Sequence, residues 1–359
     1  MVSTEKTAFE SRGLGNELML QMQVIEALRK PEAYDVEPGQ IEMKQTHISY
    51  IFLTRKYVYK MKKAINLGFL DFTTLEKRRF FCEKELFLNR RLCGDMYLDV
   101  FPINKEDSIK IGGKGVTVEY VLKMKRLPEE KMMTKLIEEN KVDRKLVDKM
   151  AETIAEFHSK AKTNKRISSF GSISVIKRNW KENYEQTREF VGKTISPEDY
   201  RLVREKVDDF IERNASFFKK RVVENRIRDC HGDIHSGNIF ITDRIYIFDA
   251  IEFNDRFRYS DVASDIAFLA MDLDFKSERN LSSFFVKRYV KYSGDRELLR
   301  LLPFYKCYRA YVRGKVISFK LNDSLVNSEE KIAANREAKA YFKLASKYAK
   351  QLYFRLLNC

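Results

Sequence analysis

The stretch "CHGDIHSGNIFITDRIYIFDAIEF", residues 230–253, holds two of the chain's four histidines within five positions. It also places Asp233, Asn238 and Asp249 around two short apolar runs separated by a turn, a pattern that predicts a tight β-hairpin. A solvated turn would account for some of these polar side chains. A site for a magnesium-bound nucleotide would account for all of them, and the remainder of the sequence has to separate the two interpretations.

The composition is that of a globular protein. The 359 residues are 44% hydrophobic and 13% aromatic, which supports a substantial core and one large two-lobed domain or two modest ones. No apolar run approaches the roughly 20 residues needed to cross a bilayer, and the first residues do not resemble a signal peptide. We therefore expect a cytoplasmic protein without a membrane partner; the oligomeric state is left open.

Charge and cysteine content narrow the class of partner. The net charge of +16 attracts anions such as nucleotides, phosphorylated metabolites or RNA, but the 68 basic and 52 acidic residues are interspersed. A nucleic-acid partner is therefore considered but not favoured. The five cysteines never form a C-x-x-C pair, which argues against a zinc cluster and a disulfide framework. Cys230 borders the candidate site without an obvious activating neighbour.

The N-terminal third alternates helix and strand patterns. A helix is predicted over residues 16–30, with Asn16 as its N-cap and with Leu18, Met22, Ile25 and Leu28 on one face. Three further predictions follow along the chain: strands over 48–53 and 56–61, a helix over 74–92 with a Thr73–Glu76 capping box, and two strands joined by the glycine turn at 112–115.

The remainder of the chain has mostly helical patterns, including a stripe of Leu146, Met150, Ile154 and Phe157 capped by Asp143. The predicted fold class is α+β. It has two parts: residues 1–126, an N-terminal helix and a small β-rich nucleotide-binding lobe, and residues 127–359, a larger helical lobe with the catalytic loop, metal site and acceptor pocket.

The polar residues of the opening stretch match the needs of phosphoryl transfer. That reaction requires a group that orients the acceptor hydroxyl, ligands for magnesium, and a fixed cation near the phosphates. Magnesium prefers oxygen ligands from carboxylates, amides and phosphates. A hairpin would bring Asn238 and Asp249 near each other, while Asp233 stays on the preceding loop, free to meet the acceptor.

The order H-x-D-x-x-x-x-N, followed by an aspartate at the end of a strand, resembles the catalytic region of protein-kinase-like enzymes. The form "HGDIHSGNIF…IFDAIEF" is similar to the aminoglycoside phosphotransferase and choline kinase branch, as is "RYSDVASDIAFLAMDLD" downstream. The resemblance spans about residues 45–320. It is nearest to an aminoglycoside-phosphotransferase-like subgroup whose members often carry an appended P-loop domain. The sequence has no G-x-x-x-x-G-K-[ST], so we expect that domain to be missing.

The resemblance implies a bilobal protein-kinase-like fold, ATP and Mg²⁺ as cofactors, and roles for individual residues. Asp233 would be the catalytic base, with Asn238 and Asp249 as metal ligands. His231 would be a structural residue of the loop, and Asp265, in the D-x-A of the downstream helix, would brace the loop through its backbone amides.

In this fold a strand lysine contacts the phosphates and pairs with a helix glutamate. Lys60 is preferred to Lys62, because Val58, two residues earlier on the same face, would then contact adenine. Glu85 is the preferred partner, with Glu83 as the alternative. The preceding strand pair has no glycine-rich loop, so backbone amides at 46–49, with the two hydroxyls of Thr46 and Ser49, are the candidate phosphate cover. Backbone groups from Lys125 to Leu127 would meet adenine as the hinge.

Asp249 is followed by Ala250 and Ile251, and no A-P-E motif follows, which favours a small hydroxylated acceptor over a protein acceptor. Residues 304–316 set Lys306, Arg309 and Arg313 along one helix face, interleaved with two tyrosines, Tyr305 and Tyr308. Such a face would suit an acceptor that carries an anionic group, although a solvated basic face with inward tyrosines is the simpler interpretation. A polycationic aminoglycoside fits this chain poorly.

The predicted function is thus an ATP-dependent, magnesium-dependent kinase of a small molecule with an alcohol group as acceptor. Two alternatives remain at this level: an RNA- or ribosome-associated ATPase or atypical kinase, and a nucleotide-binding pseudokinase. Retention of Lys60, Asp233, Asn238 and Asp249 together speaks against the pseudokinase. The sequence does not distinguish ATP from GTP.

Overall fold

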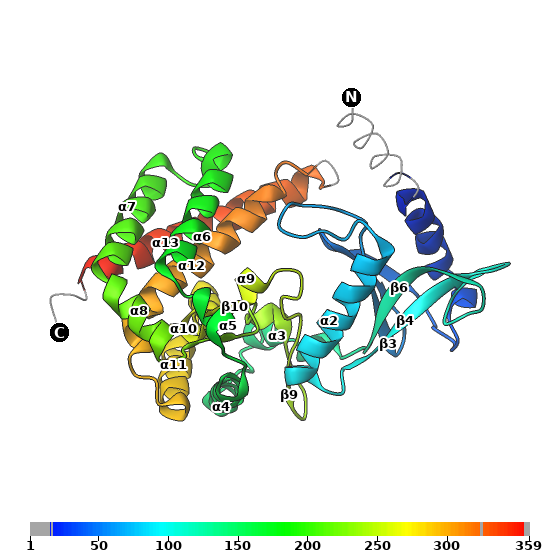
Figure 1. Ribbon diagram of the computed structural model, residues 1–359, viewed down its shortest axis with the longest axis horizontal. Helices are drawn as coiled ribbons and strands as arrows, with labels where there is room; N and C mark the ends of the chain where they lie inside the picture. The colour runs from blue at the N-terminus through cyan, green and yellow to red at the C-terminus, as the bar shows by residue number, and fades with distance from the viewer. Residues whose placement is uncertain (1–14, 16, 324–325, 355–359) are drawn as a thin grey trace. The chain divides into compact units, whose positions relative to one another are not determined.

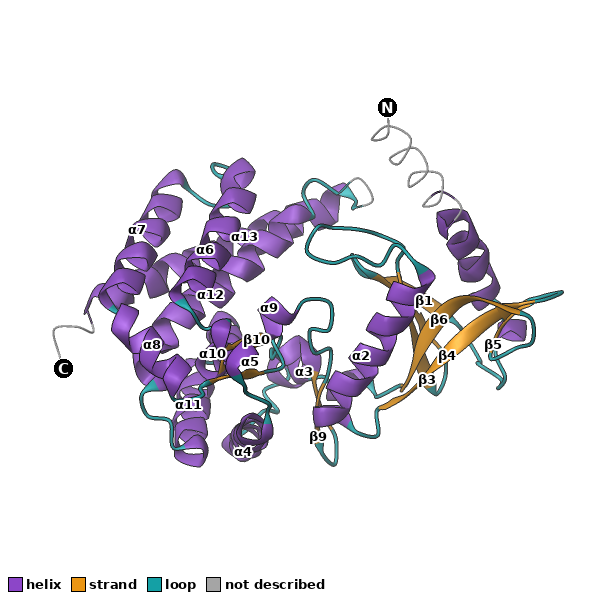
Figure 2. Cartoon of the chain, viewed as in Figure 1, coloured by secondary structure: helices purple, strands orange, loops and turns teal. Residues whose placement is uncertain are grey.

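A computed structural model of the chain describes residues 15, 17–323 and 326–354 (Figure 1). The chain divides into two compact units, Met1–Lys131 with Phe240–Asp255 and Met132–Ile239 with Arg256–Cys359. The first is rich in strands and the second is mainly helical (Figure 2). The division predicted from the sequence placed one boundary after residue 126. In the structure residues 240–255 belong to the N-terminal unit; they include most of the first hairpin strand, the turn, the returning strand and the loop after it.

The first unit is built on an antiparallel sheet with the strand order β1-β2-β3-β6-β4-β5. Its described elements after the N-terminal helix are η1 (Pro31–Ala33), β1 (Glu42–Gln45), β2 (Ser49–Leu53), β3 (Tyr57–Lys62), α2 (Leu75–Cys93), β4 (Tyr97–Lys105), β5 (Ile109–Ile111), β6 (Val116–Lys125) and η2 (Glu129–Lys131). Strand β9 (Ile245–Ile247) pairs with β8 (Ile239–Ile241) in a separate two-stranded sheet.

The side chains of strand β3 alternate between the hydrophobic core and the candidate site. Tyr59 and Met61 are buried in the hydrophobic core, together with side chains of the N-terminal helix. Lys60 and Lys62 point to the opposite face, because successive side chains of a strand alternate between faces. Helix α2 packs on strands β4 and β6 (Figure 1). The sheet therefore holds two lysines on the face where α2 supplies Glu85.

The glycine turn at residues 112–115 differs from the prediction. The strands before and after it, β5 and β6, do not pair with each other but lie on either side of β4. The connection therefore crosses the end of β4. Gly115 has φ of 96°, and a Cβ there would lie 2.3 Å from the carbonyl oxygen of Lys105. Glycine is required by this close approach, so the motif has a structural explanation.

The N-terminal helix is formed over the described residues 17–28; the predicted cap, Asn16, lies outside the described residues. Its predicted face is partly wrong. Ile25 and Leu28 are buried, but Leu18 and Met22 are 43% and 58% exposed. The apolar pattern misassigned the face because a polar side chain occupies its central position.

That polar side chain is Gln21, which is buried and bonded to three groups of the sheet region. Its Nε2 donates to the carbonyl oxygen of Lys62 at 2.8 Å and to Glu119 Oε2 at 2.6 Å. Its Oε1 accepts from the backbone N–H of Ala64 at 2.9 Å. A buried amide is stable when its donors and acceptor are satisfied in this way.

Helix α2 begins one residue later than its capping pattern predicted. Thr74, not Thr73, is the N-cap, and its side chain accepts from the backbone N–H of Lys77 at 3.3 Å. The hydroxyl of Thr73 instead donates to Asp71 at 2.6 Å. The two adjacent threonines offer the same cap chemistry, so the sequence alone could not choose between them.

The second unit consists mainly of helices around α10 (Val262–Phe275), most of whose side chains are buried. Helices α4 and α11, and helices α12 and α13, form close pairs. The predicted stripe of α4 is confirmed for Met150, Ile154 and Phe157, and Asp143 caps it at 2.8 Å. The other described elements of this unit are α3 (Met133–Glu138), α4 (Arg144–Lys160), α5 (Lys165–Ser169), α6 (Ile173–Thr187), η3 (Arg188–Phe190), α7 (Pro197–Arg213), α8 (Ala215–Val223), β7 (Ile227–Asp229), η4 (Ser236–Asn238), α9 (Asp255–Arg258), β10 (Tyr259–Asp261), α11 (Arg279–Ser293), α12 (Leu298–Phe319) and α13 (Ser328–Phe354).

Among the described residues, none of the helices combines the length and apolar character needed to cross a bilayer.

Candidate active site

In the first unit, the Lys60 ammonium lies between two carboxylates. Its Nζ is 2.8 Å from Glu85 Oε1 on α2 and 2.6 Å from Asp249 Oδ1 after β9. Burial alone would lower the pKa of Lys60, but Asp249 and Glu85 raise it well above its usual value. The lysine is therefore a fixed cation. The structure brings together three residues that the sequence placed far apart.

The alternatives left open by the sequence differ in their surroundings. Lys62 also contacts Glu85, at 2.8 Å, but its side chain is 1% exposed compared with 11% for Lys60. Glu83 pairs with Arg79 at 2.8 Å on the exposed side of α2. The geometry favours Lys60 and Glu85 as the pair that could face a phosphate, because Lys62 is enclosed.

Asp249 is held in an unusual backbone conformation. Its φ of 65° lies in the left-handed region, which few residues other than glycine adopt. The loop is fixed by two bonds: the N–H of Asp249 donates to the Tyr97 hydroxyl at 3.3 Å, and the N–H of Ala250 donates to Asn89 Oδ1 at 2.9 Å. Backbone strain of this kind is common where a side chain must be aimed at a ligand.

The predicted phosphate cover at residues 46–49 is not formed as expected. The N–H groups of Ile48 and Ser49 donate to Thr46 Oγ1 at 3.3 and 3.0 Å, and the Thr46 N–H donates to the Ser49 carbonyl at 2.9 Å. Ser49 itself is fully buried. These amides close a local turn, so Ser49 is not retained among the candidate phosphate contacts.

Residues 125–127, predicted from the sequence as the adenine-binding hinge, differ in their backbone hydrogen bonds. The N–H of Lys125 donates to the Met96 carbonyl at 2.8 Å, and that of Arg126 donates to the Lys56 carbonyl at 2.9 Å. Within the described range the N–H of Leu127 has no such acceptor. Leu127 is therefore the residue of this segment with an N–H left to donate, while Lys125 and Leu127 both stay predicted adenine contacts. Val58 is half-buried on the Lys60 face of β3, as predicted.

In the second unit, Asp233 is oriented by two neighbours. Asn238 Nδ2 donates to Asp233 Oδ2 at 2.8 Å, and His235 Nε2 lies 3.4 Å from the same oxygen. His235 Nδ1 accepts from the Gly237 N–H at 3.1 Å, so the remaining ring proton lies on Nε2 and faces Asp233. Burial alone would raise the pKa of Asp233, but His235 and Arg313 hold it below its usual value. The carboxylate is therefore ionised.

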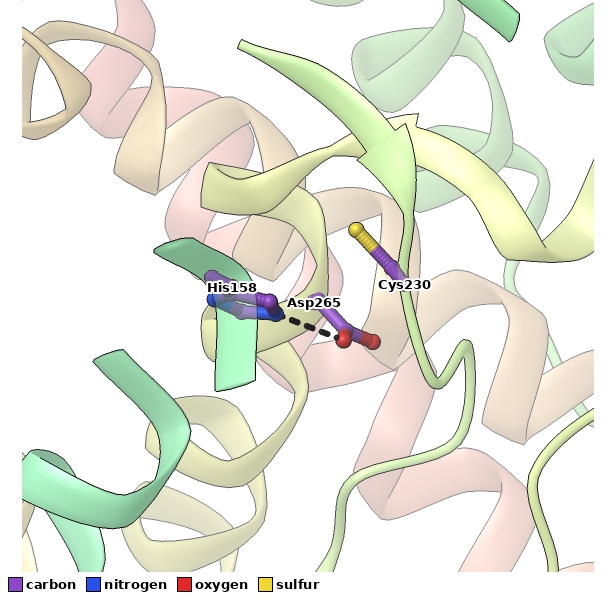
Figure 3. Close-up of side chains that lie close together, drawn as sticks. All are labelled: His158, Cys230 and Asp265. Atoms are coloured by element: carbon purple, nitrogen blue, oxygen red, sulfur yellow. Dashed lines mark hydrogen bonds and ion pairs between the residues drawn. The ribbon is translucent and has the colours of Figure 1, made fainter. Parts of the chain in front are cut away.

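Asp265 braces this loop from α10, as the resemblance implied. Its two oxygens accept from the backbone N–H groups of Gly232 at 2.8 Å and His231 at 3.0 Å. His158 on α4 adds a third bond, from Nε2 at 3.0 Å (Figure 3). Burial would raise the pKa of Asp265, but these donors, His158 foremost, lower it strongly. Asp265 is thus a buried anion that fixes the backbone beside Asp233.

Cys230 lies near His158 and Asp265, and their potential ligand atoms are within 4.8 Å of one another (Figure 3). A metal could in principle bind such a trio. However, His158 already uses both ring nitrogens, since Nδ1 bonds the Tyr289 hydroxyl at 2.7 Å, and the Asp265 oxygens are occupied. Burial also raises the pKa of Cys230 well above its usual value, which disfavours a thiolate. The trio is a structural brace.

Of the three basic residues predicted along one face of α12, two are occupied by contacts within the protein. Lys306 pairs with Asp274 at 2.9 Å. Arg309 is buried and donates to the carbonyl oxygens of Gly232 at 2.9 Å and Ser264 at 3.1 Å, so it supports the loop. The solvated basic face is thus not observed, although the tyrosines do pack inward: Tyr305 is 8% exposed, and the Tyr308 ring contacts Trp180 at 5.4 Å.

Arg313 is the exception. It lies one turn after Arg309 on α12, and its guanidinium stacks on Tyr341 at 5.6 Å. Among the described residues it makes no ion pair with a carboxylate within 4.0 Å. Its charge nevertheless acts on Asp233.

A family model described as the phosphotransferase enzyme family matches residues 109–303, more than half of the chain. The chain belongs to this family. The matched segment includes Asp233, Asn238, Asp249 and Asp265, and the family is the one that the sequence resembled.

The chain is also similar to two sequence relatives and to a solved structure. Uncharacterized proteins of Mycobacterium tuberculosis and Mycobacterium bovis are 32% identical over 277 residues, which are 77% of this chain and 54% of each relative. The chain therefore spans about half of their length. A choline/ethanolamine kinase family protein from Mesorhizobium loti is 13% identical, with a TM-score of 0.52 over 92% of this chain and 99% of that one. This likeness confirms the bilobal protein-kinase-like fold, and the fold alone.

Sequence reasoning missed several groups that hold the candidate residues in each unit. Glu252 pairs with Lys62, and His158 binds Asp265. Asn89, one turn after Glu85, anchors the Asp249 loop. Glu252 was visible three residues after Asp249, and the spacing of Asn89 from Glu85 fits one helix face. His158 had no comparable signal, because it lies in a helix stripe where buried histidines are ordinary core residues.

Proposed function

We propose that the chain transfers the γ-phosphate of ATP, in the presence of Mg²⁺, to a hydroxyl of a small molecule. The observation that carries this proposal is the position of Lys60 Nζ, within 2.8 Å of Glu85 and 2.6 Å of Asp249. A lysine fixed by a helix glutamate beside a strand-end aspartate is the arrangement that kinases use to hold nucleotide phosphates. Val58 and the Leu127 N–H would contact the adenine.

Asp249 and Asn238 are proposed as ligands of a magnesium ion, each on the oxygen that its own side chain offers. Asp249 has a side chain that is 42% exposed, so its carboxylate is accessible. Asn238 uses Nδ2 for both bonds to Asp233, at 2.8 and 3.1 Å, and among the described residues its Oδ1 accepts none. Each residue therefore offers the oxygen that magnesium prefers. When bound, the ion would neutralise charge on the phosphates.

Asp233 is proposed as the base that orients the acceptor hydroxyl and takes its proton. It is ionised, and Asn238 and His235 restrict its carboxylate to one orientation. Asp265 and Arg309 hold the adjacent backbone at Gly232 from both its N–H and its carbonyl. A base positioned in this way contributes through geometry as much as through its pKa.

Arg313 supports an acceptor with an anionic group. Its guanidinium is near Asp233, is oriented by Tyr341, and has no carboxylate partner in the described part of the chain. Arginine binds phosphate and carboxylate through two parallel hydrogen bonds. A phosphorylated or carboxylated alcohol fits this surrounding better than a polycationic aminoglycoside does.

The test is nucleotide binding followed by an acceptor screen. ATP affinity is measured for the unmodified chain, for Lys60→Met, and for Lys44→Met as a control, since Lys44 is half-exposed and pairs with Glu129 on the surface. We expect Lys60→Met alone to weaken binding by about tenfold or more, the loss of one charge-assisted contact. ADP release is then screened against hydroxylated acceptors with and without phosphate or carboxylate.

The outcome also separates the alternative functions. Binding of ATP without transfer to any acceptor would favour the pseudokinase. Equal ATP affinity in Lys60→Met and the unmodified chain would contradict the proposed phosphate contact.

A further inference from the structure

A second lysine and a third carboxylate extend the Lys60 pair into the interior of the first unit. Lys62 Nζ contacts Glu85 Oε2 at 2.8 Å and forms a close ion pair with Glu252. The five groups form one chain in the order Glu252, Lys62, Glu85, Lys60 and Asp249, with alternating charges. We call it the buried charge chain.

The proposed reaction leaves the inner half of this chain unexplained. Lys62 is 1% and Glu252 4% exposed, so neither side chain can reach a phosphate. Burying two charges is unfavourable, and their mutual attraction has to offset the loss of hydration. A lysine at position 60 with Glu85 would by itself supply the phosphate contact, so a structural or electrostatic role must account for the second pair.

The net charge of the enclosed groups indicates what the Lys62–Glu252 pair does. The four enclosed groups are two lysines and two glutamates, which sum to zero. Asp249 is the fifth group, and its side chain is 42% exposed. Because the enclosed groups already balance, the charge of Asp249 is not needed as a counter-ion inside the protein. Asp249 can leave Lys60 without exposing an unbalanced buried cation.

Chain connectivity adds a geometric constraint. Glu252 follows Asp249 by three residues, and Lys62 lies two residues after Lys60 on the same face of β3. The Lys62–Glu252 pair therefore ties the loop that carries Asp249 to the strand that carries Lys60. Glu85 contacts both lysines through its two oxygens, which fixes the plane of its carboxylate.

We propose that Glu252, acting through Lys62, is a positioning residue that balances the buried lysines and so keeps Asp249 available for a divalent cation. This inference rests on the proposed function, in which Asp249 is a metal ligand and Lys60 a phosphate contact.

The consequence of removing one charge follows from electrostatics. In Glu252→Gln the enclosed groups carry a surplus positive charge, and Asp249 becomes its counter-ion. A divalent cation then has to compete with Lys60 for the Asp249 carboxylate. The same surplus charge attracts phosphates, so the variant should still bind a nucleotide in the absence of metal. A defect in folding would instead weaken nucleotide binding under both conditions.

The experiment measures ADP affinity in EDTA and in saturating Mg²⁺, and takes the ratio as the magnesium gain. We expect Glu252→Gln to reduce this gain by about tenfold, since an unscreened charge a few ångströms away contributes on that scale, while affinity in EDTA is equal or higher. The double variant Lys62→Met with Glu252→Gln restores the balance of the enclosed charges, and we expect it to return the gain to near that of the unmodified chain.

Glu119→Gln is the matched control. Glu119, on β6, is fully buried in the same unit and pairs at 2.8 Å with Arg78, which lies on α2 as Glu85 does. The Glu119→Gln variant should lose thermal stability, as Glu252→Gln does, but it should keep the magnesium gain. A gain that is unchanged in Glu252→Gln, or reduced equally in Glu119→Gln, would overturn the inference. If the unmodified chain binds no ADP, or Lys60→Met binds it equally, the proposed function itself fails.

Discussion

Asp233 is the residue whose surroundings most directly determine the proposed chemistry. Its carboxylate has fixed neighbours and a lowered pKa, so the basic form is present throughout the neutral range. Asp233→Asn keeps the shape but removes the proton acceptor. We expect turnover with a phosphorylated acceptor to fall by about 100-fold or more, the usual contribution of a positioned base. Initial rates of ADP release at saturating ATP measure this.

The control is Asp243→Asn. Asp243 is exposed on the turn between β8 and β9 and bonds only locally, to Thr242 Oγ1 at 2.7 Å. Its rate should match that of the unmodified chain. Equal rates for Asp233→Asn and Asp243→Asn would exclude Asp233 as the base.

At this scale the sequence identified the residues with recognisable spacing. Lys60, Glu85 and Asp265 were predicted and have the predicted neighbours, while their roles in catalysis stay predictions. Ser49 was predicted because a nucleotide site needs backbone amides that contact phosphate. The local turn that Ser49 forms with Thr46 was not visible in the sequence pattern. Glu252 and His158 were missed because a buried polar residue is identified by its partner, and the partners are distant in the chain.

Asp265 links helix α10 to the loop that carries Asp233. Asp265 stabilises the loop as an anion, and its folded-state pKa lies below the unfolded value. Its contribution is therefore fully present above the unfolded pKa of about 3.9 and is lost as the pH falls below that value. We expect Asp265→Asn to lower the free energy of unfolding by about 1–3 kcal/mol near neutral pH, the cost of unpaired buried donors.

The measurement is denaturant unfolding between about pH 3 and 7, the range around that carboxyl pKa. The difference between Asp265→Asn and the unmodified chain should shrink towards the acidic end. A difference that does not change with pH would show that the brace acts through shape and not through charge.

Helices and strands with a clear periodic pattern were predicted well, while the order of the strands in the sheet was not. The strands of residues 49–53 and 57–62 and helix α2 agree with the predictions within one or two residues. Strand β4 was not anticipated, and it lies between the two strands that flank the glycine turn. Strand order depends on contacts between distant segments, and periodicity within a segment carries no information about them.

The whole molecule carries a net charge of +16, which raises the question of an RNA partner. Many described basic side chains are paired on their own helices, such as Lys160 with Glu156 at 2.6 Å and Arg213 with Asp209 at 2.6 Å. We expect only weak binding of single-stranded RNA. In filter binding between about 50 and 200 mM salt, a protein with 6–10 phosphate contacts would lose about 10³–10⁵ in affinity. A decline that steep would favour the RNA-associated ATPase.

The bonds made by Gln21 have a practical consequence for the preparation of shortened chains. One amide side chain joins the N-terminal helix to the end of β3 and to Glu119. Trimming before the first predicted strand would leave the carboxylate of Glu119 and the peptide groups at Lys62 and Ala64 without those partners. A shortened chain that starts after residue 30 should therefore lose nucleotide affinity even though every proposed ligand contact is retained.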